Sequence, residues 1–318
     1  MLLPPNINEF DPCIVLTFEQ LCTKMYTMNT LKETTEPAYA KINLGLDVVG
    51  SRSDGYHLLK MVMQTLSLHD TVTVRVVEGG SGIRTVTDSD LVPDDSHNLA
   101  FRAAGLLAEK YHIDKGIEIE IKKRIPVAAG LAGGSSDAAA VLRAVNRLFD
   151  LRLDNAGLRE TGLSLGADVP YCIEGGTRLS EGIGEILTPV VPELKGLSVL
   201  LIKPDSGVST KEVYEAFDAL DTVEHPDTDG IIKAIKAEDI PALGKLLGNV
   251  LEAVTVRKLP EISRIKDFLR QKGTMGVLMS GSGPTVFAID SKRELLENTF
   301  SEAKELFPGY EVILTETR

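Results

Sequence analysis

The chain has 318 residues, a length that predicts two domains. Hydrophobic residues make up 43% of the chain and charged residues 25%, which is typical of a soluble globular protein and excludes disorder, collagen-like repeats and coiled coil. Acidic residues outnumber basic ones by 46 to 34, and the longest basic run is Lys122-Lys123-Arg124, so we expect no nucleic-acid partner.

The first 36 residues differ from the rest of the chain, and we expect them to form an accessory or poorly ordered leader. Their apolar run Cys13-Ile14-Val15-Leu16 is too short for a secretory signal, and they contain no arginine, which argues against a transit peptide. Deletion of residues 1–34 is therefore expected to leave activity intact. The chain has no apolar run long enough to cross a membrane and three cysteines without metal-ligand spacing, so we expect a cytoplasmic protein with no membrane partner.

The segment after the leader predicts an α+β domain over residues 37–188. Strict alternation of apolar and polar residues over 71–77 and 117–122 predicts strands with one packed face and one face in water. Helical spacing of apolar residues predicts helices over 98–111, 136–149 and 158–165. A proline-containing linker at 188–192 separates this domain from a second one, residues 189–318.

The second domain has the order strand, helices, two strands, helix, strand. The predicted elements are a strand over 197–203, helices within 210–271, strands over 276–279 and 285–289, a helix over 292–306 and a strand over 310–315. That order is typical of a ferredoxin-like α+β sandwich. The sequence therefore predicts two α+β domains with a cleft between them.

A glycine-rich loop before the helix at 136–149 is the strongest functional signal. It reads Pro126-Val127-Ala128-Ala129-Gly130-Leu131-Ala132-Gly133-Gly134-Ser135-Ser136. Small residues let backbone N–H groups approach a ligand, and the helix that follows adds its unpaired N–H groups, so the loop predicts a phosphate cradle. It matches neither a Walker loop nor the dinucleotide fingerprint. The alternative is a glycine-rich helix entry with serine as an ordinary N-cap.

Three further segments carry candidate residues. Lys41 and Asn43 share one face of an otherwise apolar strand, and a buried lysine there would need an anion; the alternative is an edge lysine in water. Asp168 follows a helix end and suits a general base, or it caps a turn. The run Gly281-Ser282-Gly283 is a tight turn that in itself is explained by a hairpin.

Taken in this order, the motifs resemble the GHMP kinase superfamily. The resemblance rests on Ala38-Tyr39-Ala40-Lys41-Ile42-Asn43, on the glycine-rich loop, and on Ser280-Gly281-Ser282-Gly283-Pro284-Thr285. It runs from about residue 37 to the C-terminus. Within the superfamily, Asp54-Gly55-Tyr56-His57 and Gly166-Ala167-Asp168-Val169-Pro170 are similar to the branch that acts on 4-diphosphocytidyl-2-C-methyl-D-erythritol in the non-mevalonate isoprenoid pathway.

The resemblance implies a ribosomal-S5-like N-terminal domain that binds ATP and a ferredoxin-like C-terminal domain on the substrate side. ATP phosphates are expected on residues 126–136, with Asn98 and Lys123 near the adenine. The catalytic pair maps to Lys41 and Asp168: Asp168 would take the proton of the substrate hydroxyl, and Lys41 would keep Asp168 ionised and stabilise the developing charge. Mg²⁺ would bridge the phosphates; no metal ligand is assigned, and Ser136 is a candidate.

The resemblance also implies the substrate contacts. Tyr56 and His57 are expected to meet the cytosine, one by stacking and one by hydrogen bonding, with Tyr214 on the other side of the ring; the alternative for Tyr214 is a core residue. Asn43, Thr210 and the turn Gly281-Ser282-Gly283 are expected near the methylerythritol or its phosphates.

The predicted function is ATP-dependent phosphorylation of the substrate's 2-hydroxyl, by a monomer or weak homodimer. The alternatives are a kinase of this superfamily for another small alcohol, such as homoserine or mevalonate, and a catalytically silent nucleotide-binding relative. Asp54-Gly55-Tyr56-His57 argues against the first, because those alcohols offer no base to stack. Retention of both Lys41 and Asp168 argues against the second.

Overall fold

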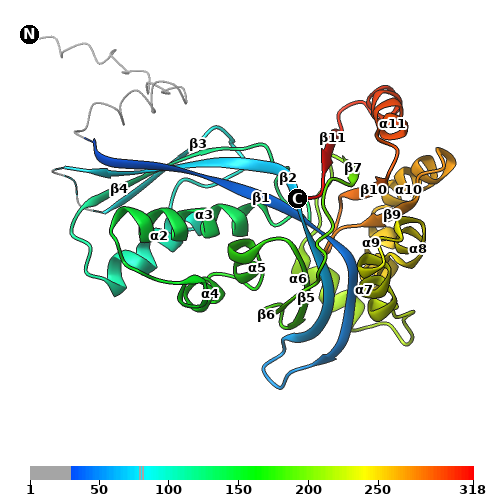
Figure 1. The fold of residues 1–318 in the computed structure, drawn as a ribbon, viewed down its shortest axis with the longest axis horizontal. Helices are drawn as coiled ribbons and strands as arrows, with labels where there is room; N and C mark the ends of the chain where they lie inside the picture. The colour runs from blue at the N-terminus through cyan, green and yellow to red at the C-terminus, as the bar shows by residue number, and fades with distance from the viewer. Residues whose placement is uncertain (1–29, 79, 81) are drawn as a thin grey trace, which may run out of the picture.

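The computed structural model describes residues 30–78, 80 and 82–318. It contains two sheets that lie beside one another (Figure 1). The N-terminal sheet has the strand order β3-β4-β2-β1-β8, with β5 paired to β2 and β6 paired to β5. Its strands are β1 (Thr30–Ser51), β2 (His57–Val77), β3 (Ile83–Thr87), β4 (Gly116–Lys122), β5 (Thr177–Gly182), β6 (Ile186–Pro189) and β8 (Gly248–Asn249).

The long antiparallel ribbon of β1 and β2 connects the two halves of the molecule. These strands contain 22 and 21 residues, and they pair from Thr30↔Val77 to Ser51↔His57. In Figure 1 the ribbon crosses the whole N-terminal sheet, and its turn projects beside β5 and β6. The middle of β1 therefore lies between the two sheets.

Four helices cover one face of the N-terminal sheet (Figure 1): α2 (Leu99–Lys110), α3 (Gly133–Leu148), α4 (Asn155–Leu163) and α5 (Val169–Glu174). The valines of β2 and the isoleucines of β4 pack against the alanine-rich faces of α2 and α3. The predicted helices and the strand predicted over 117–122 are confirmed, with shifts of up to three residues at their ends, whereas the strand predicted over 71–77 is only the last third of β2, which begins at His57. Alternation and helical spacing identified them because each element buries only one face.

The opposite face of β2 and β4 was expected to be in water, and this expectation was wrong. Arg75 is 1% exposed, Glu118 2% and Glu120 5%. The buried charges compensate one another in part, because the Arg75 guanidinium donates to Glu120 at 2.9 Å and to Glu33 at 2.5 Å. Burial raises the pKa of Glu118 above its ordinary value.

The C-terminal sheet has the order β11-β7-β10-β9, and each pair is antiparallel. Its strands are β7 (Ser198–Lys203), β9 (Gly276–Met279), β10 (Val286–Asp290) and β11 (Glu311–Glu316). Strand β7, the first of this sheet in chain order, is thus central and lies beside β11, the last. This is the ferredoxin-like arrangement predicted from the element order.

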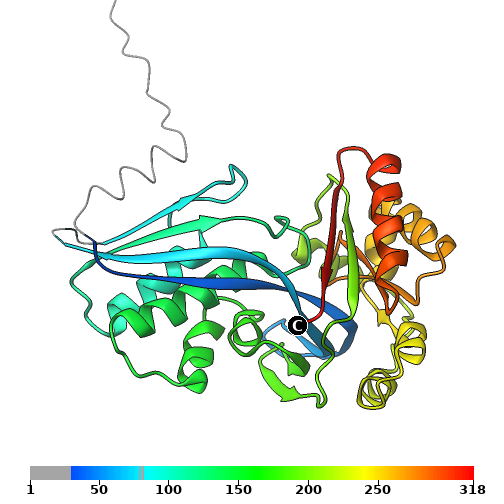
Figure 2. The same cartoon turned by 45° about the horizontal axis from the view of Figure 1, so that its top comes forward.

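Helices flank this sheet on both faces. They are α6 (Thr210–Phe217), α7 (Thr228–Lys236), α8 (Ile240–Leu246), α9 (Glu252–Lys258), α10 (Glu261–Gln271) and α11 (Arg293–Leu306). Figure 2 shows α10 and α11 on the side away from the N-terminal sheet. On the near side, Leu201 and Phe287 join the same apolar cluster as Ile42 and Leu44 of β1. This shared core holds the two sheets together.

The boundary expected between the leader and the folded protein, after residue 36, lies inside strand β1. Strand β1 begins at Thr30, and Glu36 is buried in an ion pair of 2.6 Å with Arg147. Residues 30–36 therefore form a strand rather than a leader, because β2 needs them as its pairing partner. The part of this expectation that concerns residues 1–29 lies outside the described residues.

The expected domain boundary at 188 falls at the end of β6, before β7 begins at Ser198. The predicted linker is in part a strand, since β6 extends to Pro189. The small strand β8 crosses the boundary in the other direction, because it pairs with β1 of the N-terminal sheet. In the part of the chain that the structure describes, no helix is long and apolar enough to span a membrane.

Candidate active site

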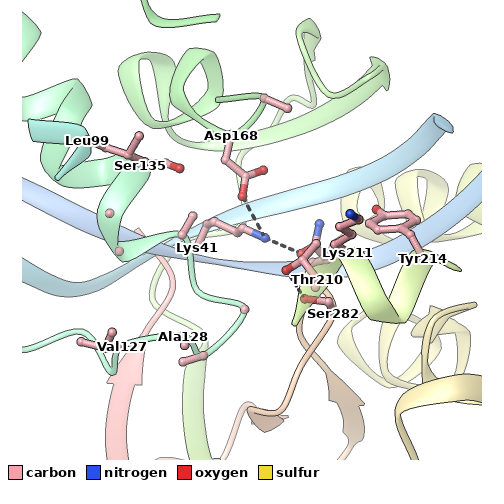
Figure 3. Close-up of a pocket in the computed structure, with 18 of the residues that line it drawn as sticks. Lys41, Leu99, Val127, Ala128, Ser135, Asp168, Thr210, Lys211, Tyr214 and Ser282 are labelled. Carbon is pink, nitrogen blue, oxygen red and sulfur yellow. Dashed lines mark hydrogen bonds and ion pairs between the residues drawn. The ribbon is translucent and has the colours of Figure 1, made fainter. Parts of the chain in front are cut away.

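A cleft of ≈ 890 Å³ lies between the helices of the N-terminal half and the loops of the C-terminal half. Its volume is near the upper end for small-molecule sites. Lys41 of β1 borders the cleft in its middle, the glycine-rich loop forms one side, and the turn between β1 and β2 closes one end with α6. Figure 3 shows the side chains that face into it.

Lys41 is buried, 4% exposed, and its ammonium group has two polar partners. It donates to Asn43 Oδ1 at 2.7 Å, and it lies 3.8 Å from Asp168 Oδ2. The two-residue spacing on β1 puts Lys41 and Asn43 on one face, as predicted, whereas the alternative of an edge lysine in water was wrong. Asp168 is the anion that a buried lysine requires.

Asp168 precedes the short helix α5, but its side chain makes no capping hydrogen bond. The alternative that Asp168 caps a turn was therefore wrong. Figure 3 shows its carboxylate pointing from the helix start toward Lys41. The side chain is 35% exposed, so it faces the cleft and is open to a ligand.

The backbone of the glycine-rich loop packs against the β9–β10 turn of the C-terminal half. Gly130 has φ +74°, and a Cβ there would come within 2.2 Å of the Ser280 carbonyl oxygen, so no other residue fits. The residue before α3 is Ala132, with φ 58° and no side-chain cap. The alternative of a serine N-cap was wrong, and the first N–H groups of α3 have no side-chain cap to compete with an anion.

Two residues of the predicted loop do not border the cleft. The Leu131 side chain is fully buried in the core between the sheets. Its backbone carbonyl accepts a hydrogen bond from Lys41 N at 3.1 Å. Ser136 is also buried, and its hydroxyl donates to the Tyr39 carbonyl. The other predicted loop residues border the cleft: Pro126, Val127, Ala128, Ala129, Gly130, Ala132, Gly133, Gly134 and Ser135.

Asn98 and Lys123 both border the cleft beside this loop. The Asn98 side chain caps α2, accepting from Ala100 N at 2.8 Å and donating to the Pro93 carbonyl at 2.7 Å. Lys123 bridges two buried carboxylates, Asp70 at 2.5 Å and Asp137 at 2.7 Å.

The bridge shifts the pKa values of Lys123 and Asp137. Burial alone would lower the pKa of Lys123, but Asp137 and Asp70 raise it above its ordinary value. Burial raises the pKa of Asp137 to about 7, against the attraction of Lys123. The Asp137 Oδ1 atom is buried without a hydrogen-bond partner. Asp137 directly follows the glycine-rich loop in the sequence, but its role was missed.

At the other end of the cleft, the aromatic residues adopt an arrangement that differs from the expected sandwich. Tyr56 is 59% exposed at the turn between β1 and β2. The His57 ring stacks directly on Tyr214, with ring centres 4.7 Å apart and planes at 26°. One face of Tyr214 is thus already covered by His57. Tyr214 borders the cleft and also packs against the apolar core of the C-terminal half, so both interpretations hold in part.

The turn between β9 and β10 contributes from the C-terminal half. Ser282 Oγ lies 2.9 Å from Thr210 Oγ1 at the start of α6, below Lys41 in Figure 3. Gly281 and Ser282 border the cleft, whereas Gly283 does not. Asn249 of β8 holds this turn by donating to the carbonyls of Met279 and Gly281, at 2.9 and 2.8 Å. No motif or pattern in the sequence pointed to Asn249.

Two further parts of the cleft were missed from the sequence. The loop before α2 contributes Leu91, Val92 and Pro93, and Leu91 is 76% exposed. Asp218, just after α6, borders the opposite end and pairs with His57. Neither part lies in a motif. For the loop before α2, the available sequence signal was a leucine among acidic residues.

Comparisons with known proteins agree with this geometry. The family model described as GHMP kinases N terminal domain matches residues 98–176, and that described as GHMP kinases C terminal matches residues 231–309. The chain is 50% identical to a 4-diphosphocytidyl-2-C-methyl-D-erythritol kinase of Acetivibrio thermocellus, over 79% of this chain and 88% of the relative. It is 45% identical to the Clostridium beijerinckii protein of the same name, over 88% of this chain and 98% of the relative.

Solved structures give the same result. A crystal structure of 4-(cytidine 5'-diphospho)-2C-methyl-D-erythritol kinase superposes with a TM-score of 0.75 at 33% identity, covering 90% of this chain and 100% of that one. The structure of L. major mevalonate kinase in complex with R-mevalonate has a TM-score of 0.72 at 16% identity, covering 92% of this chain and 98% of that one, which shows the shared fold alone.

Proposed function

The chain belongs to the GHMP kinases and, within them, to the 4-diphosphocytidyl-2-C-methyl-D-erythritol kinases, and from this premise we propose a division of labour among the residues of the cleft. The reaction is transfer of the γ-phosphoryl group of ATP to the 2-hydroxyl of 4-(cytidine 5'-diphospho)-2-C-methyl-D-erythritol, in the synthesis of isoprenoid precursors.

One observation supports the assignment of the reacting centre. The Lys41 ammonium lies 3.8 Å from Asp168, at the point where the glycine-rich loop, Thr210 and Ser282 meet. Phosphoryl transfer needs an acceptor hydroxyl in line with the γ-phosphorus and positive charge on the transferring group. A carboxylate beside a buried ammonium meets both needs.

We assign Asp168 to the acceptor hydroxyl. Its carboxylate faces the cleft and makes no capping hydrogen bond, so its oxygens are available to accept the proton of the 2-hydroxyl. Because the transition state of phosphoryl transfer is loose, orientation of the hydroxyl is as important as removal of its proton.

We propose that Lys41 supplies the positive charge at the reacting centre. The Asn43 amide oxygen holds its ammonium from one side, so Lys41 cannot swing away when a ligand enters. From this position it stabilises negative charge on the transferred group. Asn43 is thus a positioning residue for Lys41.

We assign the glycine-rich loop and the first turn of α3 to the phosphates of ATP, and Asn98 and Lys123 to the adenine side. Within the described residues no three His, Cys, Asp or Glu side chains gather as a metal site. We propose that Mg²⁺ would arrive with ATP and take most of its ligands from phosphates and water. Ser135 borders the cleft and is the hydroxyl of this loop that we propose for the metal, in place of Ser136. Mg²⁺ supplies charge neutralisation on the phosphates.

We assign the opposite end of the cleft to the substrate. Tyr56, His57 and Tyr214 gather there, and they suit the flat cytosine ring. Thr210, Gly281 and Ser282 lie between that end and Lys41, where the methylerythritol and its diphosphate would pass. We further propose that the protein acts in the cytoplasm as a monomer or weak homodimer.

The test is ADP release from ATP and Mg²⁺ with three alcohols: the cytidine compound, homoserine and mevalonate. We expect turnover with the cytidine compound alone, because neither of the other two has a base for the aromatic end. Turnover with homoserine or mevalonate would contradict the substrate assignment while leaving the kinase assignment in place. Binding of ATP without turnover of any alcohol would contradict both.

A further inference from the structure

His57 is held by contacts from the middle and the C-terminal end of α6. Its ring stacks on Tyr214, and it meets the edge of Phe217 at 6.5 Å between ring centres. Its Nε2 atom lies 2.7 Å from Asp218 Oδ1, and Asp218 immediately follows α6. Stacking fixes the plane of the ring, and the carboxylate fixes its rotation in that plane.

The partner of Nε2 determines which nitrogen of His57 carries the proton. An ionised carboxylate only accepts hydrogen bonds, so Nε2 must donate to Asp218. In the neutral imidazole the other nitrogen, Nδ1, is then an unprotonated acceptor. Within the described residues Nδ1 has no hydrogen-bond partner, whereas Nε2 has one.

We propose that Asp218 is a positioning residue for base recognition: by holding the proton of His57 on Nε2, it presents Nδ1 as an acceptor for the 4-amino group of cytosine. This inference rests on the proposed function. Uracil carries a carbonyl at that position, and its oxygen would face the Nδ1 lone pair without a proton between them. The pair His57–Asp218 thus selects an amino-pyrimidine over a keto-pyrimidine.

The informative variant is Asp218→Asn. An asparagine amide can donate to Nε2, which would move the imidazole proton to Nδ1 and turn the acceptor into a donor. The side chain of Asp218 is 57% exposed, so this change is expected to leave folding unaffected. Asp218→Ala removes the partner without offering a donor. Glu212→Gln is the matched control, since Glu212 lies on the same helix, is 65% exposed and pairs with Lys258 outside the cleft.

The first measurement is the ratio of kcat/KM for the cytidine substrate to that for its uridine counterpart. We expect Asp218→Asn to lower this ratio about tenfold or more, through KM rather than kcat, because a mismatched hydrogen bond at the base costs binding. Asp218→Ala should lower it less, and Glu212→Gln should leave it unchanged. An equal loss for both substrates would show a merely structural role and overturn the proposal.

The second measurement does not depend on turnover. Nitrogen-15 NMR of labelled histidine reports which ring nitrogen carries the proton, and calorimetry compares binding of CDP with that of UDP. We expect Nε2–H in the parent protein, Nδ1–H in Asp218→Asn, and a preference for CDP that the variant loses. Nδ1–H in the parent protein, or an unchanged preference in the variant, would overturn the inference. Failure of the parent protein to phosphorylate the cytidine compound would instead contradict the proposed function.

Discussion

Asp168 is the residue whose removal should separate binding from chemistry. Asp168→Asn keeps the shape of the side chain but removes the base and the partner of Lys41, while Asn43 still holds the Lys41 ammonium. We expect kcat to fall by about 10²–10⁴-fold, the range that a positioned acid–base group commonly contributes. Because the phosphate loop is untouched, the affinity for ATP should change little.

Turnover of Asp168→Asn is measured by ADP release, and ATP affinity by calorimetry on the same preparation. The melting temperature serves as the control for folding. Near-normal turnover in a folded variant would remove Asp168 from the mechanism and leave Lys41 acting alone.

Asp137 provides a second prediction, which concerns stability and pH. Its pKa in the folded protein is raised to about 7 from an ordinary value of 3.8, so between these values the folded state retains a proton that the unfolded state has released. Stability that comes from this group therefore falls as the pH rises through that window. Asp137→Asn cannot titrate, and relative to the parent protein it should gain on the order of 3 kcal/mol in free energy of unfolding between pH 4.5 and 8.

Urea unfolding of both proteins at pH 4.5 and pH 8 measures this difference, and any constant cost of the substitution cancels between the two pH values. Glu212→Gln, an exposed change of the same kind, should show no such gain. Parallel stability curves for Asp137→Asn and the parent protein would contradict the prediction.

At the scale of elements, the contact between the glycine-rich loop and the β9–β10 turn constrains the site closely. Gly130→Ala would place a methyl group against the Ser280 carbonyl at a φ of +74°, so the loop must move to accept it. The left-handed conformation alone costs about 1–2 kcal/mol for a residue with a side chain. We expect a lower melting temperature and a KM for ATP that rises more than the KM for the alcohol.

Thermal unfolding and steady-state kinetics on Gly130→Ala check this expectation. Ala132→Gly is the matched control for stability, since Ala132 has a φ of 58° and glycine would relieve that strain. It should raise the melting temperature slightly or leave it unchanged. If Gly130→Ala were as stable as the parent protein, with an unchanged KM for ATP, the loop would not depend on this contact.

The elements also show what the sequence could predict. Apolar patterning located β4, the last third of β2, the helices α2 to α4 and the strands of the C-terminal sheet, but it missed β3, β5, β6 and β8; the motifs located Lys41, Asp168 and most of the loop. The inward turn of Leu131 and Ser136 was missed, because neighbouring loop residues point in directions set by backbone angles that the sequence does not display. The buried Arg75 was missed because alternation reports polarity, not partners.

Long-range pairs between side chains were the least predictable part of the site. His57 and Asp218 are separated by 161 positions, and the two carboxylates of Lys123 come from β2 and α3. Each of these residues has an ordinary interpretation in its own segment. Only the packing of the two sheets brings them together.

At the scale of the whole molecule, the N-terminal limit of the folded protein can be tested by truncation. The cleft is built from residues 41 to 282, so removal of residues 1–29 is expected to leave kcat unchanged. Removal of residues 1–36 also takes away Glu36, which pairs with Arg147, and Glu33, which pairs with Arg75. It further removes the part of β1 that pairs with the end of β2. Because residues 30–34 belong to β1, we predict instead that their removal lowers stability.

Both truncations are compared with the full chain by melting temperature and by kcat. We expect the shorter protein to melt at a lower temperature, because breaking a buried ion pair from one side is strongly destabilising. Equal melting temperatures for the two truncations would show that residues 30–36 contribute nothing to stability.

The β1–β2 ribbon places the reacting centre and the base-binding end on one continuous pair of strands. Lys41 lies in the middle of the ribbon, and Tyr56 and His57 lie at its turn. The length of the ribbon therefore sets the distance between the base and the acceptor hydroxyl of a substrate that fits the cleft. Two residues added to each strand would keep every side chain on its face but move the turn outward by ~7 Å. Such an enzyme should favour an acceptor with a longer spacer between cytidine and alcohol.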